Sequence, residues 1–132
     1  MKKLLGIVVL GLLWCTPGIT FEDLSKIDIN KLRKLKSYEI KTALSNKKIV
    51  GYDFYDGNYF EETHSSQGDY LGYSKSEGEI IGKWKVEDNK LCYKWQETEF
   101  QCTVHIYTNN KTAYYFFDII NKVFFAKGYR VR

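Results

Sequence analysis

The chain contains two histidines, His64 and His105, and these are its strongest candidates for metal or acid–base chemistry. A zinc site needs three or four converging nitrogen, sulfur or oxygen ligands. No further ligands stand at metal-binding spacing from either histidine, and Cys92 and Cys102 are expected to be joined to each other. The sequence therefore predicts no metal site and no cofactor.

A second set of chemically capable residues is acidic and precedes or follows short β-type runs: Asp53, Asp56, Glu61 and Glu62. A glycosidase needs two such carboxylates facing each other roughly 5–10 Å apart. Acidic residues near the turns of a β-rich chain are more often solubilising groups. The chain also lacks a G-x-S-x-G, an H-E-x-x-H and a phosphate-binding glycine loop. We predict no catalytic residue and expect a protein that is not an enzyme.

Binding is the better candidate, because aromatic residues alternate with polar ones around a predicted turn. Asp88-Asn89 lies between two alternating runs, which is a strong hairpin signal. Folding about this turn places pairs of residues opposite each other on one face. The pairs are Val86 with Leu91, Trp84 with Tyr93, and Gly82 with Trp95.

A second hairpin, folded about Glu97, places Cys92 directly opposite Cys102. Cysteines in such a position are within reach of a disulfide. The third cysteine, Cys15, lies in a predicted targeting segment that is expected to be removed, so two cysteines remain and pair. A disulfide of this kind is expected in an oxidising compartment such as a bacterial periplasm.

The residues that follow Cys102 admit two registers. In one, Gln101, Thr103, His105 and Tyr107 share the face of Trp84, and the interior has aromatic walls with a few polar groups. The ligand-binding residues predicted from this register are Trp84, Tyr93, Trp95, Thr103, His105 and Tyr107. The other register places Phe100, Val104 and Ile106 inside, requires a β-bulge near the bridge, and turns His105 toward water. A slip of one residue exchanges the two answers.

The volume inside the predicted barrel bears on whether its interior is a ligand cavity or a packed core. Strands of six to nine residues enclose little space, and Trp and Tyr side chains can fill a barrel of eight strands. The small enclosed volume favours a packed core, with a ligand cavity as the alternative.

The elements that would position these residues are short strands with recurring turns. We predict an all-β fold, an eight-stranded antiparallel up-and-down meander or barrel with a short N-terminal helical segment. Closing the meander into a barrel would remove its exposed edges. The predicted strands are Lys48–Tyr55, Asn58–Ser65, Tyr70–Lys75, Glu79–Glu87, Lys90–Gln96, Glu99–Thr108, Thr112–Asp118 and Val123–Val131.

The N-terminal residues 1–20 have the features of a signal peptide. Lys2 and Lys3 precede an apolar run, Leu4–Trp14, whose eleven residues fall short of the about 20 that span a bilayer. Cleavage is expected after Gly18 or Thr20. Residues 21–48 are predicted to form a helical segment that packs on the barrel, and residues 49–132 the barrel domain itself.

The helical segment has an apolar stripe of Leu24, Ile27, Leu32 and Leu35, and a second short helix is expected to begin at Ser37. The second helix would carry Ile40, Ala43 and Leu44 on its apolar face. Several lysines make the segment basic, which a membrane-surface helix would also show. A helix with a solvated face that packs on the main domain is the favoured interpretation.

The charge balance excludes one large class of partner. The chain has 20 basic and 16 acidic residues, so without Lys2 and Lys3 it has 18 and 16, a net charge of +2. This is too balanced for a nucleic-acid-binding protein. No stable membrane span is expected once the signal peptide is removed.

The pattern G-x-W-x-V-x-x-x-x-L-C-Y, followed by a second cysteine and aromatic strands, resembles small secreted bacterial proteins, mostly alphaproteobacterial and of unknown function. Its specific residues are Gly82, Trp84, Leu91, Cys92 and Cys102. The overall plan is similar to the calycin barrels, of lipocalin or avidin type. In lipocalins the G-x-W stands on the first barrel strand, whereas here it stands mid-chain.

These observations together predict a secreted or periplasmic, non-enzymatic binding protein, with a small apolar or aromatic molecule held in a calycin-like barrel. The alternative is a periplasmic protein-interaction or inhibitor module that binds an envelope protein through its surface. The residues that would serve that surface are Tyr52, Tyr55, Tyr59, Phe60, Tyr70 and Tyr73.

Overall fold

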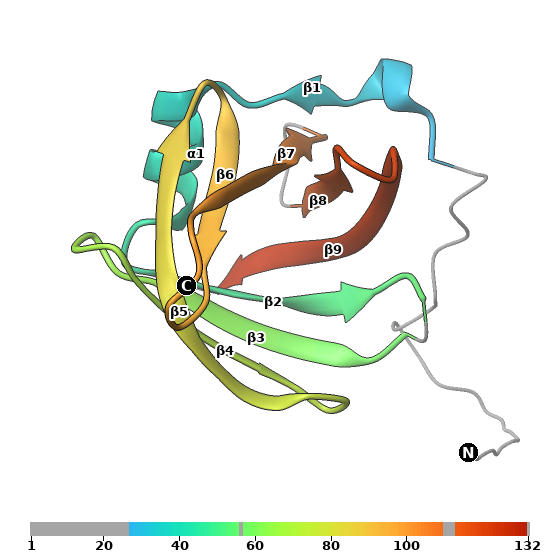
Figure 1. The fold of residues 1–132 in the computed structure, drawn as a ribbon. Helices are drawn as coiled ribbons and strands as arrows, with labels where there is room; N and C mark the ends of the chain where they lie inside the picture. The colour runs from blue at the N-terminus through green and yellow to red at the C-terminus, as the bar shows by residue number, and fades with distance from the viewer. Residues whose placement is uncertain (1–26, 56, 110–112, 132) are drawn as a thin grey trace, which may run out of the picture.

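The computed structural model of the protein describes residues 27–55, 57–109 and 113–131, and it shows a closed antiparallel β-barrel with one short α-helix (Figure 1). The predicted signal peptide lies outside the described residues. The eight barrel strands are β2 (Lys47–Asp53), β3 (Tyr59–His64), β4 (Asp69–Ser74), β5 (Gly78–Glu87), β6 (Lys90–Lys94), β7 (Gln101–Thr108), β8 (Ala113–Asp118) and β9 (Val123–Val131). The predicted fold class is thus confirmed.

The barrel is closed by the pairing of β2 with β9, from Lys48 opposite Val131 to Asp53 opposite Ala126. Two glycines, Gly51 and Gly128, face each other across this seam. A Cβ atom at Gly51 would collide with the backbone of Lys127 and Gly128, whereas one at Gly128 would meet the Ile49 side chain. The close approach of the two strands therefore requires glycine at position 51.

The hairpin between β5 and β6 has the predicted turn and register. Asp88 and Asn89 have φ angles of 52° and 61°, as in the two-residue turns that suit the twist of a β-hairpin. Trp84 pairs with Tyr93 across the hairpin, and Val86 pairs with Leu91. Beyond the ladder, the Trp95 ring covers Gly82, where an added Cβ atom would lie 2.5 Å from the ring.

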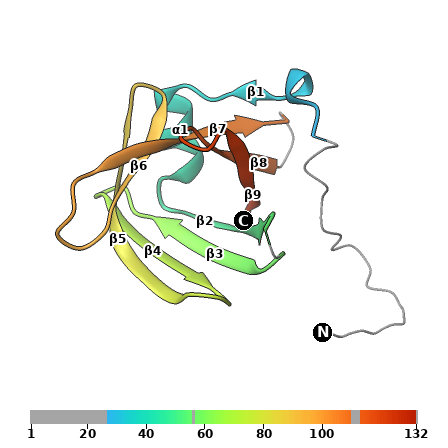
Figure 2. The same ribbon diagram turned by 45° about the vertical axis from the view of Figure 1, so that its right-hand side comes forward.

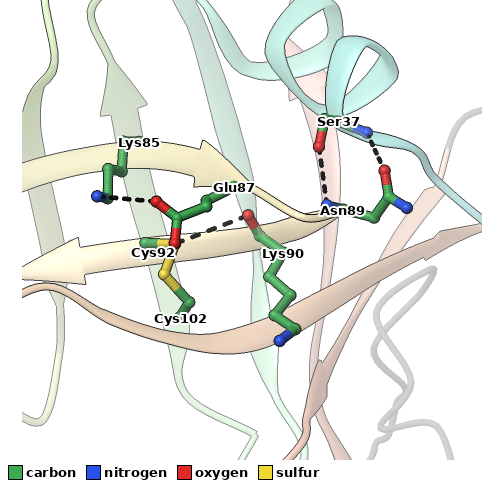
Figure 3. The surroundings of a disulfide bond; sticks show 7 residues. All are labelled: Ser37, Lys85, Glu87, Asn89, Lys90, Cys92 and Cys102. Atoms are coloured by element: carbon green, nitrogen blue, oxygen red, sulfur yellow. Dashed lines mark hydrogen bonds and ion pairs between the residues drawn. A yellow bond between two sulfur atoms is a disulfide. The ribbon is translucent and has the colours of Figure 1, made fainter.

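The disulfide between Cys92 and Cys102 is present and joins β6 to β7 at directly opposite residues (Figure 3). The register changes next to it, because a β-bulge lies between Leu91 and Cys92 in this pairing. Leu91 therefore pairs with Val104, and the strand beyond the bridge presents its other face to the interior. The structure thus has the direct Cys92–Cys102 pairing of the first predicted register together with the β-bulge of the second.

The helix α1 (Ser37–Leu44) covers one end of the barrel and buries the predicted residues Ile40, Ala43 and Leu44. Its first turn is fixed to the β5–β6 turn by two reciprocal hydrogen bonds (Figure 3). The Ser37 N–H donates to Asn89 Oδ1, and the Asn89 N–H donates to Ser37 Oγ, each at 2.8 Å. The second predicted helix is thus confirmed.

The segment before α1 differs from the expected helix wherever the structure describes it. Residues Ile29–Lys31 form a single 3-10 turn, and the short strand β1 (Arg33–Lys34) pairs with Tyr107 and Thr108 of β7 (Figures 1 and 2). Backbone pairing with the end of β7 that extends beyond β6 replaces helical hydrogen bonds there. Within the described residues, no helix is long and apolar enough to cross a membrane.

Candidate functional site

A cavity of about 390 Å³ occupies the end of the barrel away from α1. Its borders include the segment after β4, with Ser76 and Glu77, and the residue Trp95 just after β6. The interior is thus packed around α1 and hollow at the opposite end. The lining residues used below are Asp53, Phe60, Glu62, Tyr70, Glu77, Tyr93, Trp95, Thr103, Phe116 and Phe125.

One wall of the cavity is a group of three aromatic rings from β4, β6 and the residue after β6. The Tyr93 and Trp95 rings are stacked, with centroids 5.1 Å apart and an interplanar angle of 13°. The Tyr70 ring meets both of them edge-on, at 5.0 Å from Tyr93 and 5.3 Å from Trp95. These mutual contacts hold the rings in fixed orientations toward the cavity.

Glu62 brings a carboxylate to this aromatic wall. Phe60, Glu62 and His64 alternate along β3 and face the interior, and the side chain of Glu62 is 11% exposed. Its Oε2 accepts a hydrogen bond of 2.8 Å from the Tyr70 hydroxyl. Gly72, which pairs with Glu62, lets the Tyr70 ring lie across β4, since a Cβ atom there would collide with that ring.

His64 lies beside this pair and is completely buried. Its Nε2 is 2.9 Å from the Tyr93 hydroxyl and 4.0 Å from Glu62 Oε1. The imidazole is enclosed by the Tyr70 and Trp84 rings, at centroid distances of 5.1 and 5.0 Å. Within the described part of the chain, its Nδ1 is buried without a hydrogen-bond partner.

Burial shifts the pKa values of these groups in opposite directions. It raises the pKa of Glu62 to about 7, although the hydrogen bond from Tyr70 counteracts it, and it lowers the pKa of His64 to about 3. The pKa values of Tyr70 and Tyr93 are also raised, mainly by burial and then by the nearby Glu62 carboxylate. At neutral pH, therefore, His64 is uncharged and Glu62 is the group that titrates.

Four of the six predicted ligand-binding residues lie inside the barrel or at the border of the cavity. Tyr93, Trp95 and Thr103 line the cavity. Trp84 is also inside and 6% exposed, but it packs against His64 and donates a hydrogen bond of 2.7 Å to the Ser65 carbonyl. It therefore supports the base of the site without bordering the cavity.

The expectation that His105 and Tyr107 line the interior is wrong. The bulge beside the disulfide turns Val104 and Ile106 inward, and both are buried in the core. His105 stacks on Phe117, and Tyr107 belongs to an outer cluster with Phe54 and Tyr115. That outer cluster is packed against Ile27 and Leu32 of the segment before α1.

Glu62 is the principal site residue that was not predicted from the sequence to bind a ligand. Its position between Phe60 and His64 was an available signal, because strand alternation places all three on one face. Of the other carboxylates considered, Glu61 borders the cavity but pairs with Lys48 at 3.0 Å, Asp53 also lines the cavity, and Asp56 lies outside the described residues. Among the described residues there is no group of three or more potential metal ligands.

The early-strand aromatics divide between the two sides of the barrel. Phe60 and Tyr70 face the interior, whereas Tyr55, Tyr59 and Tyr73 are 73%, 48% and 50% exposed, and Tyr73 also borders the cavity. The predicted protein-binding surface therefore retains exposed aromatic residues, and its use by a partner stays a prediction.

Comparisons with family models, with curated proteins and with solved structures found no match. The class of the protein is defined by its fold and its site: it is a closed eight-stranded barrel with an aromatic-walled cavity.

Proposed function

We propose that this protein is a small-molecule-binding protein that holds an apolar or aromatic ligand in the cavity opposite α1. The observation that carries the proposal is a cavity of about 390 Å³ inside the barrel, walled by Tyr70, Tyr93 and Trp95. Ligand sites are typically hollows of about 300–1,000 Å³ with apolar walls and a few polar groups. Barrels of eight strands are wide enough to hold one small ligand.

The packing of the two ends supports the same function. At one end, α1 fills the interior with Ile40 and Leu44, so the fold has a continuous core there. At the other end, aromatic side chains line a space and do not fill it, although Trp95 is 38% exposed. Filling this space with apolar side chains would bury more apolar surface and stabilise the fold, so the unfilled space favours a binding role.

We further propose that the protein acts outside the cytoplasm as a calycin-like binding protein. The Cys92–Cys102 disulfide supports this location, since such bridges persist in oxidising compartments. The closed meander barrel supports the likeness to lipocalin and avidin barrels at the level of architecture.

The test is native mass spectrometry on protein exported to a bacterial periplasm. We expect a mass excess that disappears on denaturation, and we expect Thr103→Phe to abolish it, because Thr103 borders the cavity. The matched control is Thr63→Phe on the outer face of β3, where the side chain is exposed; it should keep the excess. A bare mass, together with no binding of apolar probes in solution, would contradict the proposal.

A further inference from the structure

The cavity combines a buried carboxylate with a lining that contains no basic side chain among the described residues. Four acidic residues border it, Asp53, Glu61, Glu62 and Glu77, and of these Glu61 is paired with Lys48. The whole chain, in contrast, has more basic than acidic residues, 20 against 16. Negative charge is therefore concentrated at this cavity against the overall balance of the protein.

Glu62 has one oxygen available to a ligand. Oε2 accepts the hydrogen bond from Tyr70, whereas the one contact of Oε1 that the structure shows within the described residues is to His64 Nε2 at 4.0 Å, beyond hydrogen-bond distance. The side chain is nearly buried and lines the cavity, so its remaining exposure faces the ligand space. Oε1 is thus positioned to accept a hydrogen bond from a ligand.

His64 does not supply the missing positive charge. Its Nε2 is engaged with the Tyr93 hydroxyl, and burial keeps the imidazole neutral, with its pKa lowered to about 3. A buried carboxylate without a cationic partner is costly. A positively charged ligand would remove that cost, because it brings the counter-charge together with the hydrogen-bond donor.

The aromatic wall suits the same kind of ligand. Tyr70, Tyr93 and Trp95 gather beside Glu62, and ring faces attract cations within about 6 Å of their centroids. Phe60, Phe116 and Phe125 also border the cavity and would contact an apolar body.

We infer that the ligand is an organic ammonium: a protonated amine whose N–H donates to Glu62 Oε1 between Tyr70, Tyr93 and Trp95, with an apolar or aromatic body in the cavity. This inference rests on the proposed function and specifies its ligand class.

The test is calorimetric titration of the exported protein at pH 8 with three probes of similar shape: phenethylamine, phenethyl alcohol and hydrocinnamate. We expect phenethylamine to bind about tenfold more tightly than the alcohol and hydrocinnamate to bind most weakly, as charge-assisted hydrogen bonds are stronger than neutral ones. Glu62→Gln should reduce the affinity for phenethylamine to that for the alcohol. The control Glu79→Gln, at an exposed position on β5, should change neither affinity.

A pH series on the unaltered protein gives a second readout that does not depend on a variant folding. The affinity for phenethylamine should fall about tenfold or more from pH 8 to pH 5.5, as Glu62 takes up a proton. The other groups facing Glu62 are His64 on β3, Tyr70 on β4 and Tyr93 on β6, and the shifted pKa values of these groups keep them uncharged throughout that range. Asp53 and Glu77 remain in Glu62→Gln, so a flat profile in that variant assigns the effect to Glu62.

The outcomes separate the two proposals. Equal binding of phenethylamine and phenethyl alcohol, or an amine preference that survives in Glu62→Gln, overturns the inference and leaves the binding function intact. Failure of all three probes to bind, with a bare native mass, overturns the binding function and the inference with it.

Discussion

Glu62 and His64 occupy neighbouring inward positions of β3, and burial affects their protonation in opposite senses. Folded Glu62 holds a proton that the unfolded chain, with its ordinary pKa of 4.5, releases. Between about pH 3 and pH 6.5, His64 is neutral in the folded protein, whereas in the unfolded chain, with its ordinary pKa of 6.5, it is protonated. Each difference makes the free energy of unfolding depend on pH.

The signs follow from these pKa values. The contribution of Glu62 to the free energy of unfolding is fully present below pH 4.5 and is lost as pH rises to about 7. That of His64 is full above pH 6.5 and is lost as pH falls to about 3. Between pH 4.5 and 6.5 the two effects oppose each other, each with a slope of up to about 1.4 kcal/mol per pH unit.

Removing the ionisable group of Glu62 should therefore expose the slope due to His64. In Glu62→Gln, we expect the free energy of unfolding to rise with pH between pH 5 and 6.5, by up to about 1.4 kcal/mol per unit more steeply than in the unaltered protein. The measurement is urea unfolding at a series of pH values, with Glu79→Gln as control. Parallel profiles for Glu62→Gln and the unaltered protein would mean that folded Glu62 titrates normally.

At the scale of the elements, the disulfide holds two neighbouring strands at the point where their register changes. Cys92 and Cys102 are ten residues apart in sequence, and the β6–β7 bulge lies directly beside Cys92. The bridge thus stabilises a pairing that the bulge has shortened.

Breaking the bridge should cost stability without altering the cavity wall. For Cys92→Ala/Cys102→Ala, loop-closure entropy predicts a loss of about 2–3 kcal/mol in the free energy of unfolding. Urea unfolding measures this loss, and reductant should lower the unaltered protein to the level of the variant while leaving the variant unchanged. No loss in either case would show that the bridge does not stabilise the fold.

The sequence predicted the strands well because their signals are local. Alternation and turn residues placed each barrel strand within about two residues of its observed ends, and Asp88-Asn89 defined the β5–β6 register. The bulge between Leu91 and Cys92 has no comparable local signal. The sequence therefore did not determine on which side of the sheet His105 and Tyr107 lie. The β1 strand also depends on a partner that is distant in sequence, the end of β7.

The candidate site was only partly predictable for the same reason. Tyr93, Trp95 and Thr103 were predicted from the face of the sheet on which they lie. The role of Glu62, in contrast, is apparent only once the positions of Tyr70 and His64 beside it are known. Those three residues come together through the pairing of β3 with β4 and a glycine at position 72 that admits the Tyr70 ring. Acidic residues are usually solvated, so composition alone favoured the wrong environment for Glu62.

At the scale of the whole molecule, the barrel has two unlike ends. The helix α1 closes one end and is hydrogen-bonded to the β5–β6 turn through Ser37 and Asn89. The opposite end contains the cavity. This division resolves the question of packed core or cavity, since the interior contains both. The packed half can provide stability, and the hollow half is available for a ligand.

The two tryptophans of the described chain report on these two halves separately. Trp95 borders the cavity, whereas Trp84 is buried against His64 and bonded to Ser65. Their indole N–H groups give distinct NMR signals, so a ligand in the cavity should move one signal and spare the other.

The most direct test is therefore to follow both indole signals while phenethylamine, phenethyl alcohol and hydrocinnamate are titrated in turn. We predict a saturable shift of the Trp95 signal with at least one probe, little change at Trp84, and loss of the shift in Thr103→Phe. An unmoved Trp95 signal with every probe, or equal shifts at Trp84 and Trp95 that persist in Thr103→Phe, would contradict the account of the cavity as a binding site.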